Sequence, residues 1–197
     1  MKVTPTYFVS GYMRCGTSMM MQALSAGGLE AAFDPARDKM NDQFGDEHYK
    51  PNEGGFYELT GKEYQKLDFP KGYEGKLIKM LFGGMYQLSA GGPYKIVFML
   101  RDFEESRQSY EGFFGQKLPI QKRDVFEAQR AKILGILHQR QDCEVFEIEY
   151  RKLVEDPEKW FRMLRDIGRF PIDPQAAAAV VDPAKCRFRL EELEVGI

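Results

Sequence analysis

Long apolar runs and a large excess of one charge are both missing from this sequence. No segment reaches the roughly 18 consecutive apolar residues that a membrane-spanning helix requires. The 197 residues include 28 lysines and arginines against 30 aspartates and glutamates, which gives a formal net charge of −2 at pH 7. We therefore expect no nucleic-acid or membrane partner through overall charge, and an anion site would have to be a local cluster of basic residues.

Cysteine is scarce as well. Cys15, Cys143 and Cys186 are far apart and odd in number, so they have neither the spacing of a metal site nor that of a disulfide framework. The sequence therefore predicts no metal ion. It favours a reducing compartment, which is typical of a cytoplasmic protein.

The order of the expected elements predicts one domain that spans residues 1–197. Apolar runs at 7–9, 76–81, 94–100 and 144–148 are typical of strands. Helical patterns with capping residues are expected over 17–24, 60–67, 102–114, 124–139 and 156–168, with a last short helix after 173. This alternation predicts a three-layer α/β/α fold with a central, mainly parallel sheet of about four to five strands, like that of P-loop NTPases.

The stretch with the most chemical information joins the first strand to the first helix. Residues 11–18 read G-Y-M-R-C-G-T-S. A glycine loop between a strand and a helix is typical of phosphate binding, because backbone N–H groups and the positive helix end face the ligand. A Walker A loop would have lysine where Thr17 stands, which argues against NTP hydrolysis but leaves an anion site. The alternative is a glycine turn that binds nothing.

A second basic position follows the strand at 94–100. Arg101 stands directly after it, and Ser109 comes about two helical turns later. A guanidinium and a hydroxyl in this arrangement can hold a second phosphate. Alternatively, Arg101 pairs with a nearby carboxylate at the surface. A Walker B strand would end in aspartate, but Asp102 is displaced by one position, which disfavours that interpretation.

In these two pieces and in two others, the sequence resembles sulfotransferases that use 3′-phosphoadenosine 5′-phosphosulfate (PAPS). Residues 13–18 are similar to the family's P-[RK]-S-G-T-[ST] loop, and residues 101–109 to R-[DN]-P-x-[DE]-x-x-x-S. Residues 150–157 are similar to Y-E-D-L-x-x-[DN]-P, and residues 52–58 to the N-P-x-G-[FY]-[FY]-E of some bacterial members. The pieces occur in the family's order and span nearly the whole chain, so the chain resembles a short, bacterial-type member.

The resemblance implies a cofactor site and the residues that form it. The loop would hold the 5′-phosphosulfate, with Cys15 contributing its backbone N–H, and Arg101 with Ser109 would hold the 3′-phosphate. Tyr150 matches a tyrosine that lies near the adenine in relatives. The implied cofactor-binding residues are Arg14, Cys15, Gly16, Thr17, Ser18, Arg101, Ser109 and Tyr150.

The sequence also departs from the family's pattern. Met13 replaces the usual proline, Cys15 the usual serine and Phe103 a common proline. Cytosolic members have K-T-H at the end of the second strand, whereas here Lys79 is followed by methionine and Leu81. The histidine that would act as the base is therefore absent.

Three residues are expected to act in sulfuryl transfer. Arg14 would stabilise charge on the leaving 5′-phosphate, and Lys79 would steer the sulfuryl group, unless it is a surface lysine. Glu58 is our choice for the general base, because it follows two glycines and two aromatic residues that can form the wall of a pocket. The alternatives for the base are His48 and Asp34, or Glu58 is a surface carboxylate without a role.

The acceptor is expected to be a small molecule with a hydroxyl or amine group, and the product nucleotide would be adenosine 3′,5′-bisphosphate. Residues 29–59 should form an irregular segment on the acceptor side, and its aromatic residues suit an apolar or sugar-like compound. Two other functions stay open. One is a P-loop-like nucleotide or small-molecule kinase, and the other is a non-catalytic nucleotide-binding or partner-binding module.

Overall fold

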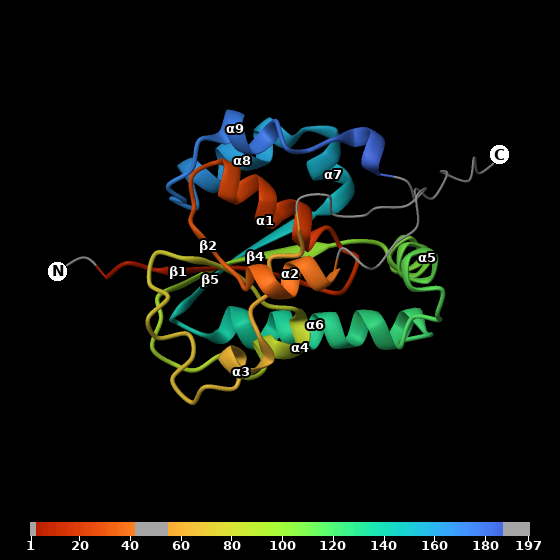
Figure 1. Cartoon of the computed structure of the whole chain (residues 1–197), viewed down its shortest axis with the longest axis horizontal. Helices are drawn as coiled ribbons and strands as arrows, with labels where there is room; N and C mark the ends of the chain where they lie inside the picture. The colour runs from red at the N-terminus through yellow and green to blue at the C-terminus, as the bar shows by residue number, and fades with distance from the viewer. Residues whose placement is uncertain (1–2, 42–54, 187–197) are drawn as a thin grey trace.

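The computed structural model describes residues 3–41 and 55–186. In these residues, nine α-helices and one short 3-10 helix surround a sheet of five strands, and all neighbouring strands are parallel (Figure 1). In spatial order the strands are β2 (Ala31–Ala32), β3 (Leu77–Lys79), β1 (Thr6–Gly11), β4 (Tyr94–Leu100) and β5 (Cys143–Glu149). The predicted α/β fold with a parallel sheet is confirmed at this level.

Helices cover both faces of the sheet, which is compatible with the three layers expected (Figure 1). One face carries α1 (Thr17–Ala26), α7 (Tyr150–Glu155), α8 (Pro157–Asp166) and α9 (Pro174–Ala178). The other carries α3 (Gly61–Tyr64), α4 (Phe82–Met85) and α6 (Arg123–Gln139). The remaining helical segments are α2 (Pro35–Asn41), α5 (Phe103–Phe114) and η1 (Pro183–Lys185). Within residues 3–41 and 55–186, every helix falls short of the length and apolar character needed to traverse a bilayer.

The central strand β1 separates two apolar cores. Its six residues are all buried. Tyr7 and Val9 belong to a core that includes residues of α1 and α8, whereas Phe8 packs with residues of α6. Successive side chains of a strand point to opposite faces, so the apolar run at this place serves both layers of helices.

The two edge strands are less buried than the centre. β2 has only two residues. In β5, Glu144, Glu147 and Glu149 are exposed while Ile148 is buried. The alternation of polar and apolar residues predicted an edge position for this strand, and the sheet order confirms it.

Most predicted helix starts are confirmed by their capping bonds. Backbone N–H groups of the first turns of α3, α5, α8 and α9 donate to the side chains of Thr60, Asp102, Asp156 and Asp173. The capping box expected from Asp124 and Glu127 is wrong, because the N-cap of α6 is Lys122, two residues before Asp124, and α6 has no side-chain cap. Asp124 lies inside the first turn instead, where its negative charge interacts favourably with the positive end of the helix dipole.

Four elements were not predicted from the sequence, namely β2, α2, α7 and η1. β2 consists of two alanines and exists through its pairing with β3. α2 begins at Pro35 within the segment expected to be irregular, and α7 follows β5 without any turn residue between them. In addition, Gly83 and Gly84 lie inside α4, although they were expected to flank a helical turn.

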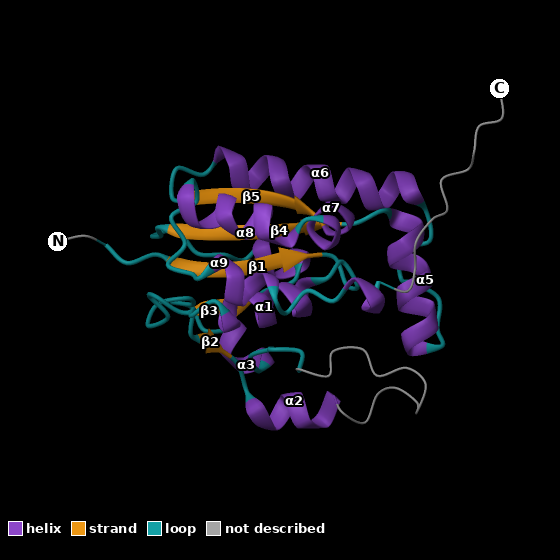
Figure 2. Ribbon diagram, turned by 90° about the horizontal axis from the view of Figure 1, so that it is seen from above, coloured by secondary structure: helices purple, strands orange, loops and turns teal. Residues whose placement is uncertain are grey.

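All five strands point toward α5 (Figure 2). The loop after β1 and the residues after β4 therefore lie at the same edge of the sheet, as expected for parallel strands. Gly11 ends β1 with φ 141°, and a Cβ there would lie 2.7 Å from the carbonyl oxygen of Met99 in β4. Only glycine allows the two strands to run this close together into the loop.

Candidate functional site

The loop between β1 and α1 has left-handed backbone at two positions. Arg14 has φ 68° and Gly16 has φ 88°. A Cβ on Gly16 would overlap the ring of Tyr150, so this position requires glycine. Because Gly16 has no side chain, the start of α1 lacks a side-chain cap there, and its positive end begins at the loop. Thr17 and Ser18 are the first two residues of α1, and both are buried.

Tyr12 anchors the loop to α4 and α6. Its ring stacks on that of Phe82, with 3.7 Å between the ring centres, and its hydroxyl donates to Gln129 Oε1 at 2.9 Å. Burial raises the pKa of Tyr12 to about 12. The hydroxyl therefore stays a hydrogen-bond donor at neutral pH.

The loop meets α5 at Arg14. Its Nε donates to Ser109 Oγ at 3.2 Å, and its Cζ lies 4.7 Å from the centre of the Phe113 ring. Arg14 and Ser109 are 95 residues apart in the sequence. The structure thus brings together a residue expected at the 5′-phosphosulfate and a residue expected at the 3′-phosphate.

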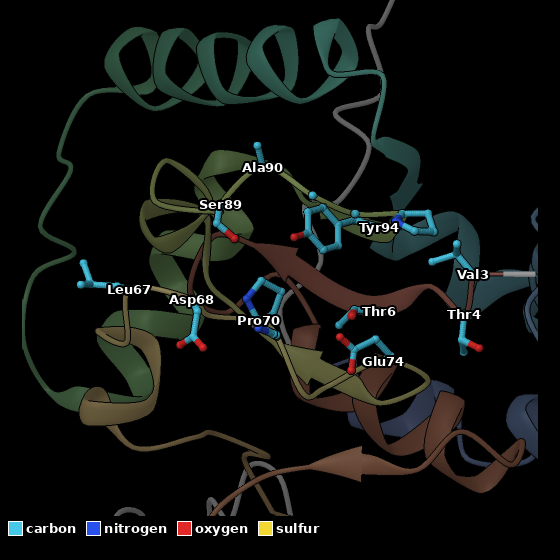
Figure 3. Close-up of a pocket in the computed structure, with 14 residues that line it drawn as sticks. Val3, Thr4, Thr6, Leu67, Asp68, Pro70, Glu74, Ser89, Ala90 and Tyr94 are labelled. Carbon is cyan, nitrogen blue, oxygen red and sulfur yellow. The ribbon is translucent and has the colours of Figure 1, made fainter. Parts of the chain in front are cut away.

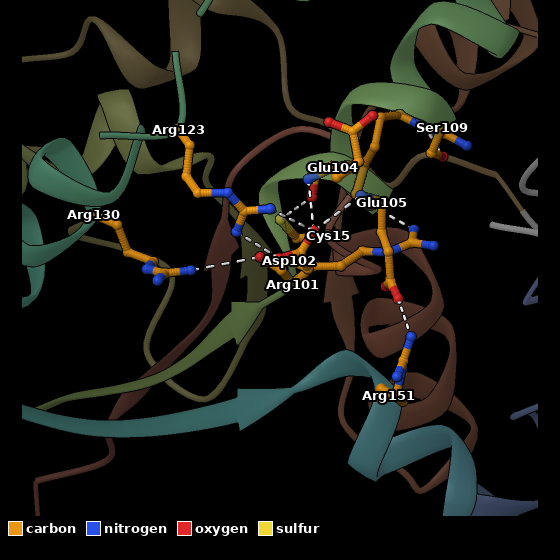
Figure 4. A network of polar contacts seen from close by, with 11 residues as sticks. Cys15, Arg101, Asp102, Glu104, Glu105, Ser109, Arg123, Arg130 and Arg151 are labelled. Carbon is orange, nitrogen blue, oxygen red and sulfur yellow. Dashed lines mark hydrogen bonds and ion pairs between the residues drawn. The ribbon is translucent and has the colours of Figure 1, made fainter. Parts of the chain in front are cut away.

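Arg101 extends this cluster of basic residues (Figure 4). Its Nη1 donates to the carbonyl oxygen of Arg14 at 2.9 Å, and its Cζ lies 4.4 Å from the centre of the Tyr150 ring. Its Nε donates to Glu105 Oε2 at 3.2 Å, and Arg151 Nη2 donates to the other oxygen, Oε1, at 2.5 Å. Arg101 and Glu105 are both buried. Arg101 therefore does pair with a carboxylate, but the alternative of a surface pair is wrong.

Cys15 is a buried part of the loop. Its Sγ lies 3.5 Å from Ser106 Oγ, and burial raises the pKa of the thiol, which disfavours the reactive thiolate. Its backbone N–H donates to the carbonyl oxygen of Tyr12 at 3.3 Å. The resemblance implies a bond from this N–H to the phosphosulfate, and that role stays a prediction.

Lys79, at the end of β3, connects the start of α1 to the segment before α3. Its Nζ donates to Ser18 Oγ and to the carbonyl oxygen of Phe56, both at 2.9 Å, and lies 3.5 Å from Glu58 Oε1. The side chain is 4% exposed, so the alternative of a surface lysine is wrong. Burial lowers the pKa of Lys79, and the charge of Glu58 acts in the opposite direction.

Glu58 is held from a second side by α2. Its Oε2 accepts a hydrogen bond from Arg37 Nη2 at 3.0 Å, and its side chain is 23% exposed. Asp38, the next residue of α2, accepts hydrogen bonds from the backbone N–H groups of Phe56 and Tyr57. Helix α2 thereby fixes both the carboxylate of Glu58 and the backbone just before it.

The other candidates for the base are less well connected to the loop. Asp34 Oδ1 accepts from the backbone N–H of Ala36 at 2.9 Å, which supports the start of α2. His48 lies outside the described residues. Of the aromatic residues expected on the acceptor side, Phe33 and Tyr57 are in contact, with 5.0 Å between ring centres.

The predicted site residues form two neighbouring clusters that share the start of α1. The first contains Arg14, Arg101, Ser109 and Tyr150, and the second contains Ser18, Glu58 and Lys79. The sequence-based prediction missed Arg37, Asp38, Glu105 and Arg151. Glu105 lies in the first turn of α5, four residues after Arg101, which precedes the N-cap Asp102, so only their closeness in sequence could have indicated this pair. Arg37, Asp38 and Arg151 make their contacts with residues of other elements, far away in the sequence. No local sequence pattern indicates such contacts.

A cavity of about 420 Å³ lies at the end of the sheet where the strands begin (Figure 3). Its lining includes Thr6 and Tyr94, which begin β1 and β4, whereas the candidate site lies where these strands end. Asp68, Lys71 and Glu74 in the lining carry charges of both signs. The cavity is therefore separate from the candidate site, and its lining favours no class of ligand.

Comparison with protein-family models finds no match to this chain, and neither does comparison with curated proteins. In the described ranges 3–41 and 55–186, no group of three or more His, Cys, Asp or Glu side chains is arranged to hold a metal ion. The basis for a function is therefore the geometry of the two clusters and the motifs that they contain.

Substitution of Gly16 tests the contact between the loop and Tyr150. Gly16→Ala adds a Cβ that overlaps the ring at φ 88°, while the control Gly72→Ala has φ 87° and nothing within 4 Å of the added Cβ. Both variants should lose about 1 kcal/mol of unfolding free energy through the left-handed backbone, and the overlap should cost Gly16→Ala about 1–3 kcal/mol more. Urea unfolding measures both, and equal losses would contradict the contact.

Lys79→Met tests the burial of the ammonium group. An amine whose pKa is lowered by folding binds fewer protons in the folded state than in the unfolded state, so stability rises with pH between the two pKa values. The wild type should therefore gain stability relative to Lys79→Met as the pH approaches 10.5, the ordinary pKa of lysine. Urea unfolding of both proteins between about pH 7 and pH 10 measures this gain. A stability difference independent of pH would show that folding leaves the lysine pKa unchanged.

Proposed function

We propose that this protein is a sulfotransferase that moves the sulfuryl group of PAPS to a hydroxyl or amine of a small molecule. The observation that carries the proposal is the 3.2 Å hydrogen bond from Arg14 Nε to Ser109 Oγ, beside Arg101. It supports the proposal because residues expected at the two ends of one nucleotide are neighbours. They lie at the carboxyl edge of a parallel sheet, where such sheets bind ligands.

The residues around the loop suit a ligand with two separate anionic groups. The start of α1 at Gly16 offers a positive helix end, and Arg14 and Arg101 add guanidinium groups, which bind phosphate in bidentate geometry. PAPS has a phosphosulfate and a separate 3′-phosphate, and it supplies an activated sulfuryl group when bound. The residues proposed to hold the phosphosulfate are Arg14, Cys15, Gly16, Thr17 and Ser18, while Arg101 and Ser109 would hold the 3′-phosphate and Tyr150 would lie near the adenine.

Glu58 and Lys79 are the residues proposed to act at the acceptor. A bond forms between the acceptor oxygen and sulfur while the bond from sulfur to the 5′-phosphate oxygen breaks, and Glu58 takes the proton of the acceptor hydroxyl. Arg14 stabilises the charge on the leaving nucleotide, adenosine 3′,5′-bisphosphate. Lys79 would steer the sulfuryl group. Its Nζ, 2.9 Å from Ser18 Oγ and 3.5 Å from Glu58 Oε1, also holds the base close to the start of α1.

A P-loop-like origin of the fold and a cytoplasmic location belong to the same proposal. β1, the glycine loop and α1 follow one another as in P-loop proteins, with Thr17 in place of the lysine. The three cysteines are free thiols, which supports a reducing compartment. The proposal assigns no role to a metal ion, a nucleic acid or a membrane.

The kinase alternative has less support from the site. Thr17 stands where a P-loop lysine would reach the β- and γ-phosphates. Asp102, the nearest candidate for a Walker B carboxylate, caps α5 and pairs with Arg123 Nη1 at 2.7 Å. A non-catalytic nucleotide-binding module differs from the proposal in its lack of turnover, and a partner-binding module differs in its lack of nucleotide binding, so experiments on binding and on transfer separate these functions.

Calorimetric titration with adenosine 3′,5′-bisphosphate, ADP, and ATP with magnesium tests the nucleotide. The bisphosphate should bind about tenfold or more tightly than ADP, because only the bisphosphate has a 3′-phosphate for the guanidinium of Arg101. Arg101→Ala should remove this preference. Arg107→Ala is the matched control, since Arg107 lies in α5, just after Arg101 in the sequence, and pairs with Glu104 and Glu111, and it should keep the preference.

Other outcomes of this titration would overturn the proposal. Preference for ATP with magnesium would favour the kinase, and binding of none of the three nucleotides would favour a module with another partner. A preference that survives in Arg101→Ala would place the 3′-phosphate elsewhere.

Glu58→Gln tests the general base. Transfer from PAPS to a panel of phenols, alcohols and amines should fall by about 10²-fold or more. The affinity for the bisphosphate should stay unchanged, because Glu58 pairs with Arg37 and Lys79 rather than with Arg14 or Arg101. Asp34→Asn is the matched control, since it makes the same change at the alternative carboxylate. Formation of the sulfate product measures both variants. Full activity in Glu58→Gln with loss in Asp34→Asn would assign the base to Asp34.

A further inference from the structure

Glu105 is a buried carboxylate that lies between two arginines (Figure 4). Its side chain is 3% exposed. Oε2 accepts from Arg101 Nε at 3.2 Å, and Oε1 accepts from Arg151 Nη2 at 2.5 Å. The function proposed above uses Arg101 but gives no role to Glu105 or Arg151.

The charges of these three groups affect how strongly Arg101 attracts an anion. Arg101 and Glu105 alone form a neutral pair, and the carboxylate would repel a phosphate bound to the same guanidinium. Charges a few ångströms apart interact strongly at the effective dielectric constant of a protein. Arg151 binds the second oxygen of Glu105, so two guanidinium groups and one carboxylate leave one net positive charge.

The start of α7 holds Arg101 from two directions. Tyr150 and Arg151 are the first two residues of α7. The ring of Tyr150 lies 4.4 Å from Arg101 Cζ, and Arg151 binds the carboxylate that accepts from Arg101 Nε. The sulfotransferase pattern that residues 150–157 resemble, Y-E-D-L-x-x-[DN]-P, has glutamate where Arg151 stands.

We propose that Arg151 is a positioning residue of the nucleotide site, which offsets the charge of Glu105 and so leaves Arg101 oriented and attractive to a 3′-phosphate. Arg151 has this role only if Arg101 binds that phosphate, as the proposed function requires. It acts through Glu105 and does not need to touch the nucleotide.

The affinities for adenosine 3′,5′-bisphosphate and for AMP test this role, because their ratio isolates the contribution of the 3′-phosphate. Arg151→Gln removes the charge from a side chain that is 37% exposed, and it should lower the ratio about tenfold. Arg151→Lys keeps the charge and should keep most of the ratio. The double variant Glu105→Gln/Arg151→Gln removes both charges, yet its amide oxygen at position 105 can still accept from Arg101, and it should recover the wild-type ratio.

Recovery of the ratio in the double variant distinguishes a positioning role from general support of the fold. Loss of general support would lower the affinities for both nucleotides alike. An unchanged ratio in Arg151→Gln overturns the inference, and so does a double variant as weak as the single one. If Arg151→Gln does not fold, the double variant alone tests the inference. An affinity ratio in the double variant well below that of the wild type overturns it. A wild-type ratio close to one overturns the proposed function itself, and this role with it.

Discussion

The stack formed by Gly16, the Tyr150 ring and the Arg101 guanidinium is the contact on which the candidate site depends. The ring occupies the space that a side chain at position 16 would need, and it lies 4.4 Å from Arg101 Cζ. Burial raises the pKa of Tyr150 to about 12, so the ring stays uncharged under Arg101 near neutral pH. The loop after β1, the end of β4 and the start of α7 are thereby held in one place.

A buried ammonium group has the corresponding role on the acceptor side. Burial of a charge is unfavourable unless partners compensate for the lost water. Lys79 Nζ has oxygen atoms of Ser18, Phe56 and Glu58 within 3.5 Å. These oxygens come from α1 and from the segment before α3, so one side chain connects the proposed nucleotide and acceptor sides.

Local signals predicted the parts of the fold that depend on residues close in sequence. The apolar run at Tyr94–Leu100 is β4 with the expected bounds, and Asp102 caps α5 as expected. α2 was missed because Asp38 stabilises its position through the backbone of a segment that comes later in the chain. The pair of Arg151 and Glu105 joins residues 46 positions apart. The parallel sheet indicated that Arg14, in the loop after β1, and Arg101, directly after β4, would lie at the same ends of the strands. It did not indicate which contacts their side chains would make.

The edges of the sheet have a consequence for behaviour at high protein concentration. β2 is two residues long at one edge, and β5 exposes Glu144, Glu147 and Glu149 at the other. A long, uncharged strand edge pairs readily with another chain, and short or charged edges do not. Both edges of the described sheet are therefore poor templates for aggregation by strand addition.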